Sequence, residues 1–534
     1  MKICLVRPPS FCKNLTYPSG PRFGLPLSLL YLGANLESVG HEVVLYDALS
    51  DLEIEDLRPD RDGSYHVGAS WDKVALRVRE CAPDLVGITN PFSDFVSCTI
   101  KCAEVIKENL PSAYIVVGGP HATSEPSAFL YDGSPVDYIM RAECESAVLS
   151  LCTALSKGGD LLKVPNLAYC RKGELQCNQL APFLVDLDKL PLPAYHLADL
   201  EKSFELVKAG FPSRFSFAYP GSHREVSLIT SRGCPFGCIF CGNHLHMGRR
   251  WRYHSVGYIM RHMELLVLHY GVRHFHIEDD NLGLDPKRFE TFLDALLAKE
   301  WNITWDTPNG IRADRLPPAL LEKVKASGCT YLIFGIESGN QKVLDTIVKK
   351  NLRLDDVTKS ARYAKRCRLD VHAFYVVGFP GETRREIVDT FRYALKMLAL
   401  YDVIPHLCLA RPLPGTSLFE MCQEKGFLTE PVLPQIGKGL RGELFARRMI
   451  RTSDFSPAQL EKWVSSFNRK VITLIILKSA IFLLFHPRVA KQAIGGALSS
   501  SGVKSALLKI FFGGLFYKFN YLNPRLRQKK SRVA

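Results

Sequence analysis

The sequence has no internal repeats, no low-complexity runs and no apolar stretch long enough to be a confident membrane span. The missing repeats exclude a solenoid or a propeller built from copied units. The apolar run at residues 471–485 is fifteen residues long and is interrupted by Lys478, whereas a helix needs about 20 apolar residues to cross a bilayer core. No signal peptide precedes the strand-like residues 2–6, so we expect a cytoplasmic protein.

Acidic residues are missing from the C-terminal tail. From Lys462 to the last residue the chain has fourteen Lys and Arg residues and no Asp or Glu, and the other 54 Lys and Arg residues equal the 54 acids in number. The net charge of +14 therefore belongs to the tail. A nucleic-acid-binding enzyme would carry a basic groove through its body instead, so we expect no nucleic-acid partner.

The length of 534 residues exceeds what one hydrophobic core usually holds, so two or three domains are expected. The hydrophobic content of 47% and the charged content of 23% are typical of globular proteins. Most of the sixteen cysteines are scattered, and scattered free thiols indicate a reducing compartment.

Three cysteines form a cluster in one glycine-rich loop that follows the apolar run 226–230. They are Cys234, Cys238 and Cys241, and thiolates in such a loop select zinc or an iron–sulfur cluster. A structural zinc site needs four ligands, and His244 or His246 could supply the fourth. A [4Fe–4S] cluster is normally held by four cysteines, so three would leave one iron free to bind another molecule. The residues alone leave both alternatives open.

This loop resembles the signature of the radical S-adenosylmethionine (SAM) superfamily, a CxxxCxxC motif with an aromatic residue, here Phe240, before the last cysteine. The resemblance implies that Cys234, Cys238 and Cys241 bind a [4Fe–4S] cluster. The open iron would bind SAM, and electron transfer would cleave SAM to a 5′-deoxyadenosyl radical. It also implies an electron donor of the flavodoxin or ferredoxin type.

The first 150 residues read as alternating short strands and helices, which predicts a doubly wound parallel sheet. Such sheets bind ligands at the carboxyl ends of their strands. The loops that begin at Arg7, Thr89, Gly118 and Arg141 should therefore share one edge.

Placed before the cysteine loop, this segment resembles the cobalamin-binding domain of B12-dependent radical SAM enzymes. The resemblance rests on the opening 24–28 (GLPLS), the strand 83–89 (PDLVGIT) and the turn 116–123 (VVGGPHAT). It implies that cobalamin is contacted by Thr89, Asn90, Gly118, Gly119, His121 and Glu143. His121 could equally cap its own turn.

The chain departs from that family's pattern in two places. The DxHxxG motif is absent, since residues 62–68 match it only superficially, and we do not assign His66 as a cobalt ligand. The family's GEGE segment reads Arg141-Ala-Glu143-Cys-Glu145.

After the cysteine loop the alternation resumes, with strands at 274–277, 301–307, 331–334, 373–377 and 407–410 and a helix over 252–270. Four polar residues, 278–281, follow one strand, where barrel enzymes place catalytic groups; they could instead cap the helix at 286–297. Family resemblance implies that Asp280 binds the SAM ammonium, Glu337 and Ser338 approach its ribose and methionine, and Gly378 meets the adenine. His276, His372 and His406 are expected inside the barrel, more often as core residues than as catalysts.

We therefore predict an α/β protein of four parts. Residues 1–155 form a Rossmann-like cobalamin-binding domain, 156–225 a connector, 226–430 a partial (β/α)6 radical SAM barrel and 431–534 a helical, basic tail. Basic and bulky apolar residues interleave in 462–534, which favours peripheral contact with an anionic membrane. A helical cap on the barrel is the alternative.

The predicted activity is methylation of an unactivated carbon on a hydrophobic substrate, a lipid, an isoprenoid or a tetrapyrrole. Cyclisation or rearrangement on the same cofactors is the first alternative. A non-catalytic cobalamin- or cluster-binding sensor is the second, although a sensor would not need the complete cysteine triad.

Overall fold

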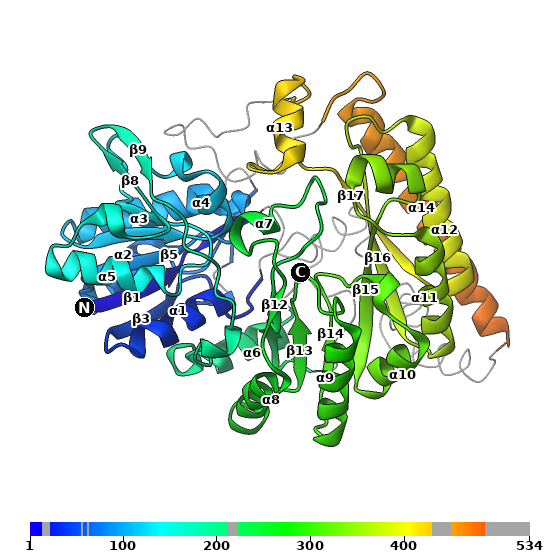
Figure 1. Cartoon of the computed structure of the whole chain (residues 1–534), viewed down its shortest axis with the longest axis horizontal. Coiled ribbons are helices and arrows are strands. Elements are labelled where there is room, and N and C mark those ends of the chain that lie inside the picture. The colour runs from blue at the N-terminus through cyan, green and yellow to red at the C-terminus, as the bar shows by residue number, and fades with distance from the viewer. Residues whose placement is uncertain are drawn as a thin grey trace.

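The structure, a computed structural model, describes residues 1–12, 22–54, 57–60, 63–211, 213, 222–429 and 450–485. Two α/β units lie side by side, and the short helix α7 (Asn243–His246) lies between them (Figure 1). The N-terminal unit is drawn in blue to cyan and the larger unit in green to yellow.

The N-terminal unit is built on one twisted sheet whose strand order is β3-β1-β5-β6-β7-β8-β9. The first five strands in this order are parallel, and the last two form an antiparallel hairpin. Because the later strands β3 and β5 flank β1 on opposite sides, the chain reverses its winding direction at β1. The strands are β1 (Lys2–Arg7), β3 (Glu42–Asp47), β5 (Leu85–Thr89), β6 (Tyr114–Gly118), β7 (Tyr138–Met140), β8 (Leu167–Arg171) and β9 (Glu174–Cys177).

Helices cover both faces of this sheet, as a doubly wound fold requires. One apolar cluster holds residues of α1 (Leu27–Glu37) and α5 (Ala147–Lys157), and another holds residues of α2 (Trp71–Cys81) and α3 (Val96–Asn109). The prediction of a doubly wound sheet is confirmed. The hairpin β8–β9 lies within residues 156–225, the predicted connector, but it continues this sheet, because β8 pairs with β7 from Tyr138 to Met140.

The second unit is a six-stranded parallel sheet in sequential order, which is the expected partial barrel. Helices alternate with its strands, and the main apolar core lies between strands and helices. The strands are β10 (Glu225–Leu228), β13 (His274–Ile277), β14 (Thr304–Asp306), β15 (Cys329–Glu337), β16 (Asp370–Val377) and β17 (Ile404–Leu409). The covering helices are α8 (Val256–Glu264), α9 (Pro286–Ala298), α10 (Pro318–Ala326), α11 (Leu354–Arg366) and α12 (Arg384–Tyr401).

The helix predicted over 252–270 is wrong at its start. Arg252 and Tyr253 form the strand β12, which pairs with β11 (Ser231–Arg232) across the cysteine loop. The helix begins after Ser255, whose side chain accepts the backbone N–H of Tyr258 and so caps α8. Helical periodicity does not distinguish a two-residue strand next to a cap from an additional helical turn.

The first part of the tail packs against the barrel. Helix α14 (Pro457–Phe485) follows α13 (Ser417–Glu424), and its Phe467 ring stacks on Phe391 of α12 with the ring centroids 4.8 Å apart. Lys478 donates to the carbonyl oxygens of Leu398 and Ala399, at the end of α12. Within the described ranges, no helix combines the length and apolarity that a membrane crossing requires. Residues 486–534 of the predicted basic tail lie outside the described residues.

Candidate active site

The cysteine loop is the long connection of a small hairpin. Strands β11 and β12 pair antiparallel, with Arg232 opposite Arg252, and residues 233–251 connect them. Gly233 has φ +84°, and a Cβ there would lie 2.4 Å from the carbonyl oxygen of Arg250, so only glycine fits this turn.

The three thiols of this loop are suited to a bound iron–sulfur cluster. All three cysteines are half-buried and none forms a disulfide. Burial raises the pKa of Cys241 to about 11 and raises that of Cys238, although Lys350 acts in the opposite direction on Cys238. These thiols therefore become thiolates when a metal centre binds them and displaces their protons.

Residues of the barrel fix the loop from beneath. The Arg312 guanidinium lies 3.8 Å from the centre of the Phe236 ring, and the Phe240 ring lies 5.9 Å from that of Phe379. The Ile239 N–H donates to the carbonyl of Val348 at 3.2 Å. The aromatic residue of the motif thus packs against the barrel next to the last cysteine.

The acidic segment after β13 organises the start of the loop. Asp279 is buried and accepts the hydroxyls of Thr230 and Ser231, which fixes the turn after β10. Asp280 accepts the N–H of Gly233 at 2.9 Å, and its burial raises the pKa of this carboxyl. The cap of α9 is Asp285, so residues 278–280 do not cap this helix.

A second group predicted to contact SAM lies at the end of β15. Glu337 adopts φ +71°, and its carboxylate accepts a hydrogen bond from Lys350 at 2.9 Å. Cys238 is also close enough to Lys350 for each to affect the other's pKa. Ser338 is fully buried, and its hydroxyl lies 3.0 Å from that of Thr390. Lys350 therefore connects the expected SAM site electrostatically with the cysteine loop.

The turn after β16 is held by Glu382. This buried carboxylate accepts the N–H groups of Gly378 and Phe379 at 2.7 and 3.2 Å, and burial raises its pKa to about 8. Gly378 has φ +91°, and a Cβ there would lie 2.8 Å from Leu460 of α14. The close approach at Gly378 is therefore to the C-terminal helix, and its contact with adenine remains a prediction.

The edge of the N-terminal sheet brings Thr89, Asn90, Gly118 and Gly119 together. Thr89 and Gly118 are paired at the ends of β5 and β6, and Gly119 has φ +123°. A Cβ on Gly119 would lie 2.2 Å from the carbonyl oxygen of Asn90, so the two turns touch. His121 is buried, with Nδ1 2.9 Å from the Ser93 hydroxyl. His66 lies elsewhere, with Nε2 2.8 Å from the carbonyl oxygen of Ala69.

Glu143 is committed to protein contacts. Both of its carboxylate oxygens accept hydrogen bonds from Arg252 at 2.7 Å, and the neighbouring Glu145 accepts one from Arg232 at 2.6 Å. Burial opposes ionisation of Glu145, but Arg232 lowers the pKa of this carboxyl below its usual value. The side-chain contacts of Glu143 therefore do not support the cofactor contact implied by the resemblance.

Inside the barrel, four buried groups on the neighbouring strands β10, β13 and β14 form a charged cluster. His276 Nδ1 and His274 Nε2 lie 2.9 and 3.1 Å from the two carboxylate oxygens of Asp306, and His276 Nε2 lies 3.6 Å from Glu225. Burial works against charge here, yet the carboxylates raise the pKa of His276 to about 10, and the histidines lower that of Asp306. The raised pKa favours the imidazolium form of His276, which lies between two carboxylates.

The other two barrel histidines pair with each other. The rings of His372 and His406 are nearly parallel and meet edge to edge, with their centroids 4.9 Å apart and Nδ1 of the first 2.6 Å from Nε2 of the second. Both side chains are buried. All three histidines therefore lie within the barrel, as predicted, and their contacts are with protein groups.

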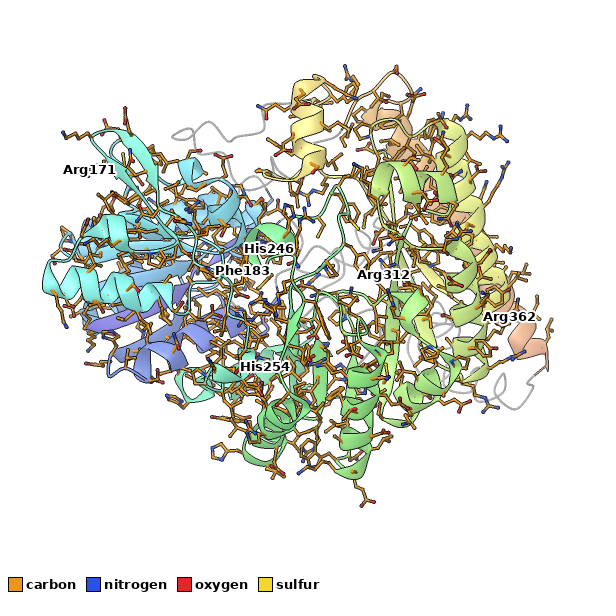
Figure 2. All side chains as sticks on the ribbon, viewed as in Figure 1. Arg171, Phe183, His246, His254, Arg312 and Arg362 are labelled. Atoms are coloured by element: carbon orange, nitrogen blue, oxygen red, sulfur yellow. The ribbon has the colours of Figure 1, made fainter. Side chains whose placement is uncertain are left out.

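A cavity of about 320 Å³ opens between the two units. Its walls come from the loops after β5 and β6, from α7 at the end of the cysteine loop, and from the loop after β17. Asp94 and Arg411, which come from different units, form an ion pair at 3.3 Å on this cavity. His246, labelled in Figure 2, lies at the junction of the units, and burial lowers its pKa to about 4.

Sequence reasoning missed the cations that position these groups: Arg232, Arg252, Arg312 and Lys350. The two arginines that flank the cysteine loop are visible in the sequence, but their glutamate partners are 87 and 109 residues away. Only the three-dimensional structure pairs such distant positions.

Comparison with known proteins gives two family matches. Residues 228–394 match the model described as the radical SAM superfamily, and residues 22–151 match the B12 binding domain. The chain is 30% identical over 424 residues to an uncharacterized methyltransferase of Pyrococcus horikoshii, covering 79% of this chain and 83% of the relative. It is 30% identical over 439 residues to cytidylyl-2-hydroxyethylphosphonate methyltransferase of Streptomyces wedmorensis, covering 76% of this chain and 79% of that relative. An anaerobic magnesium-protoporphyrin IX monomethyl ester cyclase of Synechocystis is 26% identical over 408 residues, covering 75% of this chain and 73% of that relative.

Two solved structures share the fold over most of the chain. The radical SAM methyltransferase TsrM of Kitasatospora setae, with cobalamin and a [4Fe–4S] cluster bound, superposes with a TM-score of 0.63 at 18% identity, covering 88% of each chain. The cobalamin-dependent enzyme OxsB, with aqua-cobalamin bound, gives a TM-score of 0.67 at 16% identity, covering 99% of this chain and 80% of that one.

Proposed function

The chain belongs to the cobalamin-dependent radical SAM enzymes, and from that premise we propose that it methylates an unactivated carbon of a hydrophobic small molecule. The family is of the methyltransferase type, and its cofactors are a [4Fe–4S] cluster, SAM and cobalamin. When bound, the cluster and SAM would supply a 5′-deoxyadenosyl radical for hydrogen abstraction, and cobalamin would supply the methyl group.

On the barrel side, the chain's own residues hold and orient the first two cofactors. Cys234, Cys238 and Cys241 would bind three irons of the cluster. Asp280 would bind the SAM ammonium while it accepts the N–H of Gly233, and Lys350, which donates to Glu337, would orient this carboxylate toward the SAM ribose. These roles are proposals that follow from the contacts described above.

On the opposite side, the edge of the N-terminal sheet would hold cobalamin. The touching turns at Asn90 and Gly119 form a closely packed backbone surface, and His121 stands beside them with Ser93. A planar ligand can approach closely where glycine leaves no side chain in the way. Thr89, Asn90, Gly118, Gly119 and His121 are therefore the proposed contacts.

The observation that carries the proposal is the cavity between the units. Loops of the B12-binding domain, the cysteine loop and the last barrel loop line it together. A molecule in this cavity would touch both cofactor-binding units at once, as hydrogen abstraction and methyl transfer on one carbon require.

The lining of the cavity supports a largely apolar substrate. Pro91, Phe92, Leu413 and Pro414 contribute apolar surface, and the charges of Asp94 and Arg411 compensate each other. The relative that acts on magnesium-protoporphyrin IX monomethyl ester is consistent with this class. The relative named for a cytidylyl phosphonate shows that polar substrates also occur among similar chains.

The test is an anaerobic reaction of reconstituted protein with SAM, cobalamin, dithionite and a lipid extract, read by mass spectrometry. Formation of 5′-deoxyadenosine and S-adenosylhomocysteine together with a lipid heavier by one CH₂ supports the proposal. The matched control is Cys238→Ala, which should form neither nucleoside. In the cell we propose a flavodoxin or ferredoxin as the electron donor, and either protein should replace dithionite in this assay.

Radical cyclisation is the second candidate, because a relative covered over 73% of its length is named a cyclase. The same assay separates the two reactions. A product without added CH₂, formed with 5′-deoxyadenosine but without S-adenosylhomocysteine, would favour cyclisation and contradict methyl transfer.

We also propose peripheral membrane contact through residues 462–534 of a cytoplasmic protein. The described end of α14 supports it: Ile476, Leu477, Ile481 and Leu484 are exposed, and Leu484 is 79% exposed. The triple change Leu477→Ser, Ile481→Ser, Leu484→Ser should reduce co-sedimentation with anionic vesicles, whereas Leu162→Ser, an exposed leucine of the N-terminal unit, should not. Equal sedimentation of wild type and triple variant would contradict this contact.

A further inference from the structure

The narrow base of the cysteine loop carries two arginines that face each other. Arg232 and Arg252 are directly paired in the β11–β12 ladder, and their side chains are 6% and 2% exposed. Like charges at directly opposed positions destabilise a strand pair. Burial increases the cost, because each guanidinium has lost its water.

The opposite charges come from the other unit. Glu143 and Glu145 follow β7 of the N-terminal sheet, and their side chains are 7% and 16% exposed. Arg252 donates to both oxygens of Glu143, and Arg232 donates to Glu145 and lies 3.4 Å from Glu143. The four charges sum to zero. We call these four residues the inter-domain clamp.

Three members of the clamp, Arg232, Arg252 and Glu145, also contact their own surroundings. Arg252 donates to the carbonyl of Met247 within the cysteine loop and to that of Leu184 in the connector. The Arg232 guanidinium lies 5.4 Å from the centre of the Tyr31 ring on α1, and Asn35 of α1 donates to the backbone carbonyl of Glu145. The clamp therefore joins the cysteine loop, the connector and two segments of the N-terminal unit.

We propose that the inter-domain clamp is a positioning device that fixes the cysteine loop relative to the B12-binding domain. Without Glu143 and Glu145, two buried arginines face each other and the base of the loop must open. The docked N-terminal unit therefore completes the shape of the loop and sets the separation between cluster and cobalamin. The four side chains are positioning residues that act through the loop, and this inference rests on the proposed two-cofactor function.

The residue change that tests the clamp removes charge and keeps size. Glu143→Gln and Glu145→Gln are made singly and together in the full chain, loaded with cluster and cobalamin. The matched control is Asp137→Asn, which removes the Lys107 partner within the N-terminal unit, at the start of β7. If the double variant does not fold, Glu145→Gln alone tests the proposal, because this substitution affects a single hydrogen bond from an arginine.

The first measurement needs no turnover. Pulsed electron paramagnetic resonance reports the magnetic coupling between the reduced cluster and cob(II)alamin. We expect iron and cobalamin contents equal to wild type but a changed coupling in all three clamp variants, and wild-type coupling in Asp137→Asn. Unchanged coupling in Glu145→Gln and in the double variant would overturn the proposal, even if the enzyme proves to be a methyltransferase.

The second measurement is the ratio of methylated product to 5′-deoxyadenosine. Because misplacement by about 1 Å can cost roughly 100-fold in rate, we expect this ratio to fall by about 10-fold to 100-fold while SAM cleavage continues. A general loss of stability would lower both products together and leave the ratio unchanged, which would contradict a positioning role. If wild type forms no methylated product, the proposed function fails, and the magnetic coupling alone then decides about the clamp.

Discussion

Two buried charged groups of four residues each, both in the described part of the chain, are held together by different kinds of cation. The inter-domain clamp joins two structural units and pairs two arginines with two glutamates. The barrel cluster of Glu225, His274, His276 and Asp306 lies on three neighbouring strands of one sheet. The first group fixes where two separate units meet, and the second fixes the interior of one unit.

The cations of the two groups explain the difference. Arginine keeps its charge at every pH at which a protein folds, so the clamp binds its carboxylates constantly and in the planar, bidentate manner seen for Glu143. Histidine can lose its charge, so the barrel cluster depends on the proton of His276. A permanent charge suits a contact that sets cofactor geometry, whereas a titratable one makes the barrel interior sensitive to pH.

The largest expected effect follows from removal of a clamp arginine. Arg252→Met leaves Glu143 buried beside a single cation, and breaking a buried pair typically costs about 3 to 5 kcal/mol. We place this variant near 5 kcal/mol, because the two carbonyl contacts of Arg252 are lost as well. Urea unfolding followed by circular dichroism measures the change.

The conservative control is Arg252→Lys, which keeps the charge but cannot donate in a bidentate manner. We expect roughly half of the loss, about 2 to 3 kcal/mol. Equal stability of Arg252→Met and wild type would show that the clamp does not stabilise the docked arrangement.

A smaller loss is expected from Asp306→Asn in the barrel cluster. The amide keeps the size of the side chain but leaves the His276 cation with Glu225 alone, so we expect a cost of about 3 kcal/mol. The variant should retain normal coupling between cluster and cobalamin, because the clamp is intact. Altered magnetic coupling with unchanged unfolding would reverse the roles assigned to the two groups.

The pH dependence of stability separates the two groups without breaking either. The pKa of His276 rises from about 6.5 in the unfolded chain to about 10 in the folded protein. Its stabilising contribution is therefore complete below pH 6.5 and is lost as the pH rises through 10. Between these values the free energy of unfolding should fall by about 1.4 kcal/mol per pH unit from this group.

The comparison that isolates this slope uses His276→Asn. We expect wild type to lose stability more steeply than the variant between pH 7 and 9, and the clamp arginines add nothing to this slope because arginine does not titrate there. Identical slopes for wild type and His276→Asn would show that His276 is not protonated in the folded protein.

The two groups also show which features of the structure could be predicted from the sequence. Alternating strands and helices predicted both sheets, and the motif around Cys234, Cys238 and Cys241 indicated the family, because each signal lies within a few adjacent residues. His274 and His276 could be assigned to the barrel from the strand on which they lie. Their hydrogen bonds to Asp306 could not be predicted, because the register between neighbouring strands is set by the tertiary fold. The inter-domain clamp could not be predicted from the sequence, since Glu143 and Arg252 come into contact only when the two units dock.

The smallest effect is expected where the same two units meet in solvent. The side chains of Asp94 and Arg411 are 44% and 43% exposed, and such pairs contribute about 0.2 to 1 kcal/mol because water and salt screen them. Asp94→Asn should therefore shift urea unfolding by less than about 1 kcal/mol, and the shift should vanish in 1 M salt, whereas the loss in Arg252→Met should persist. If Asp94→Asn instead lowered the free energy of unfolding by several kcal/mol at both low and high salt, exposed and buried contacts would both stabilise the docked units. Burial would then not be what distinguishes the inter-domain clamp.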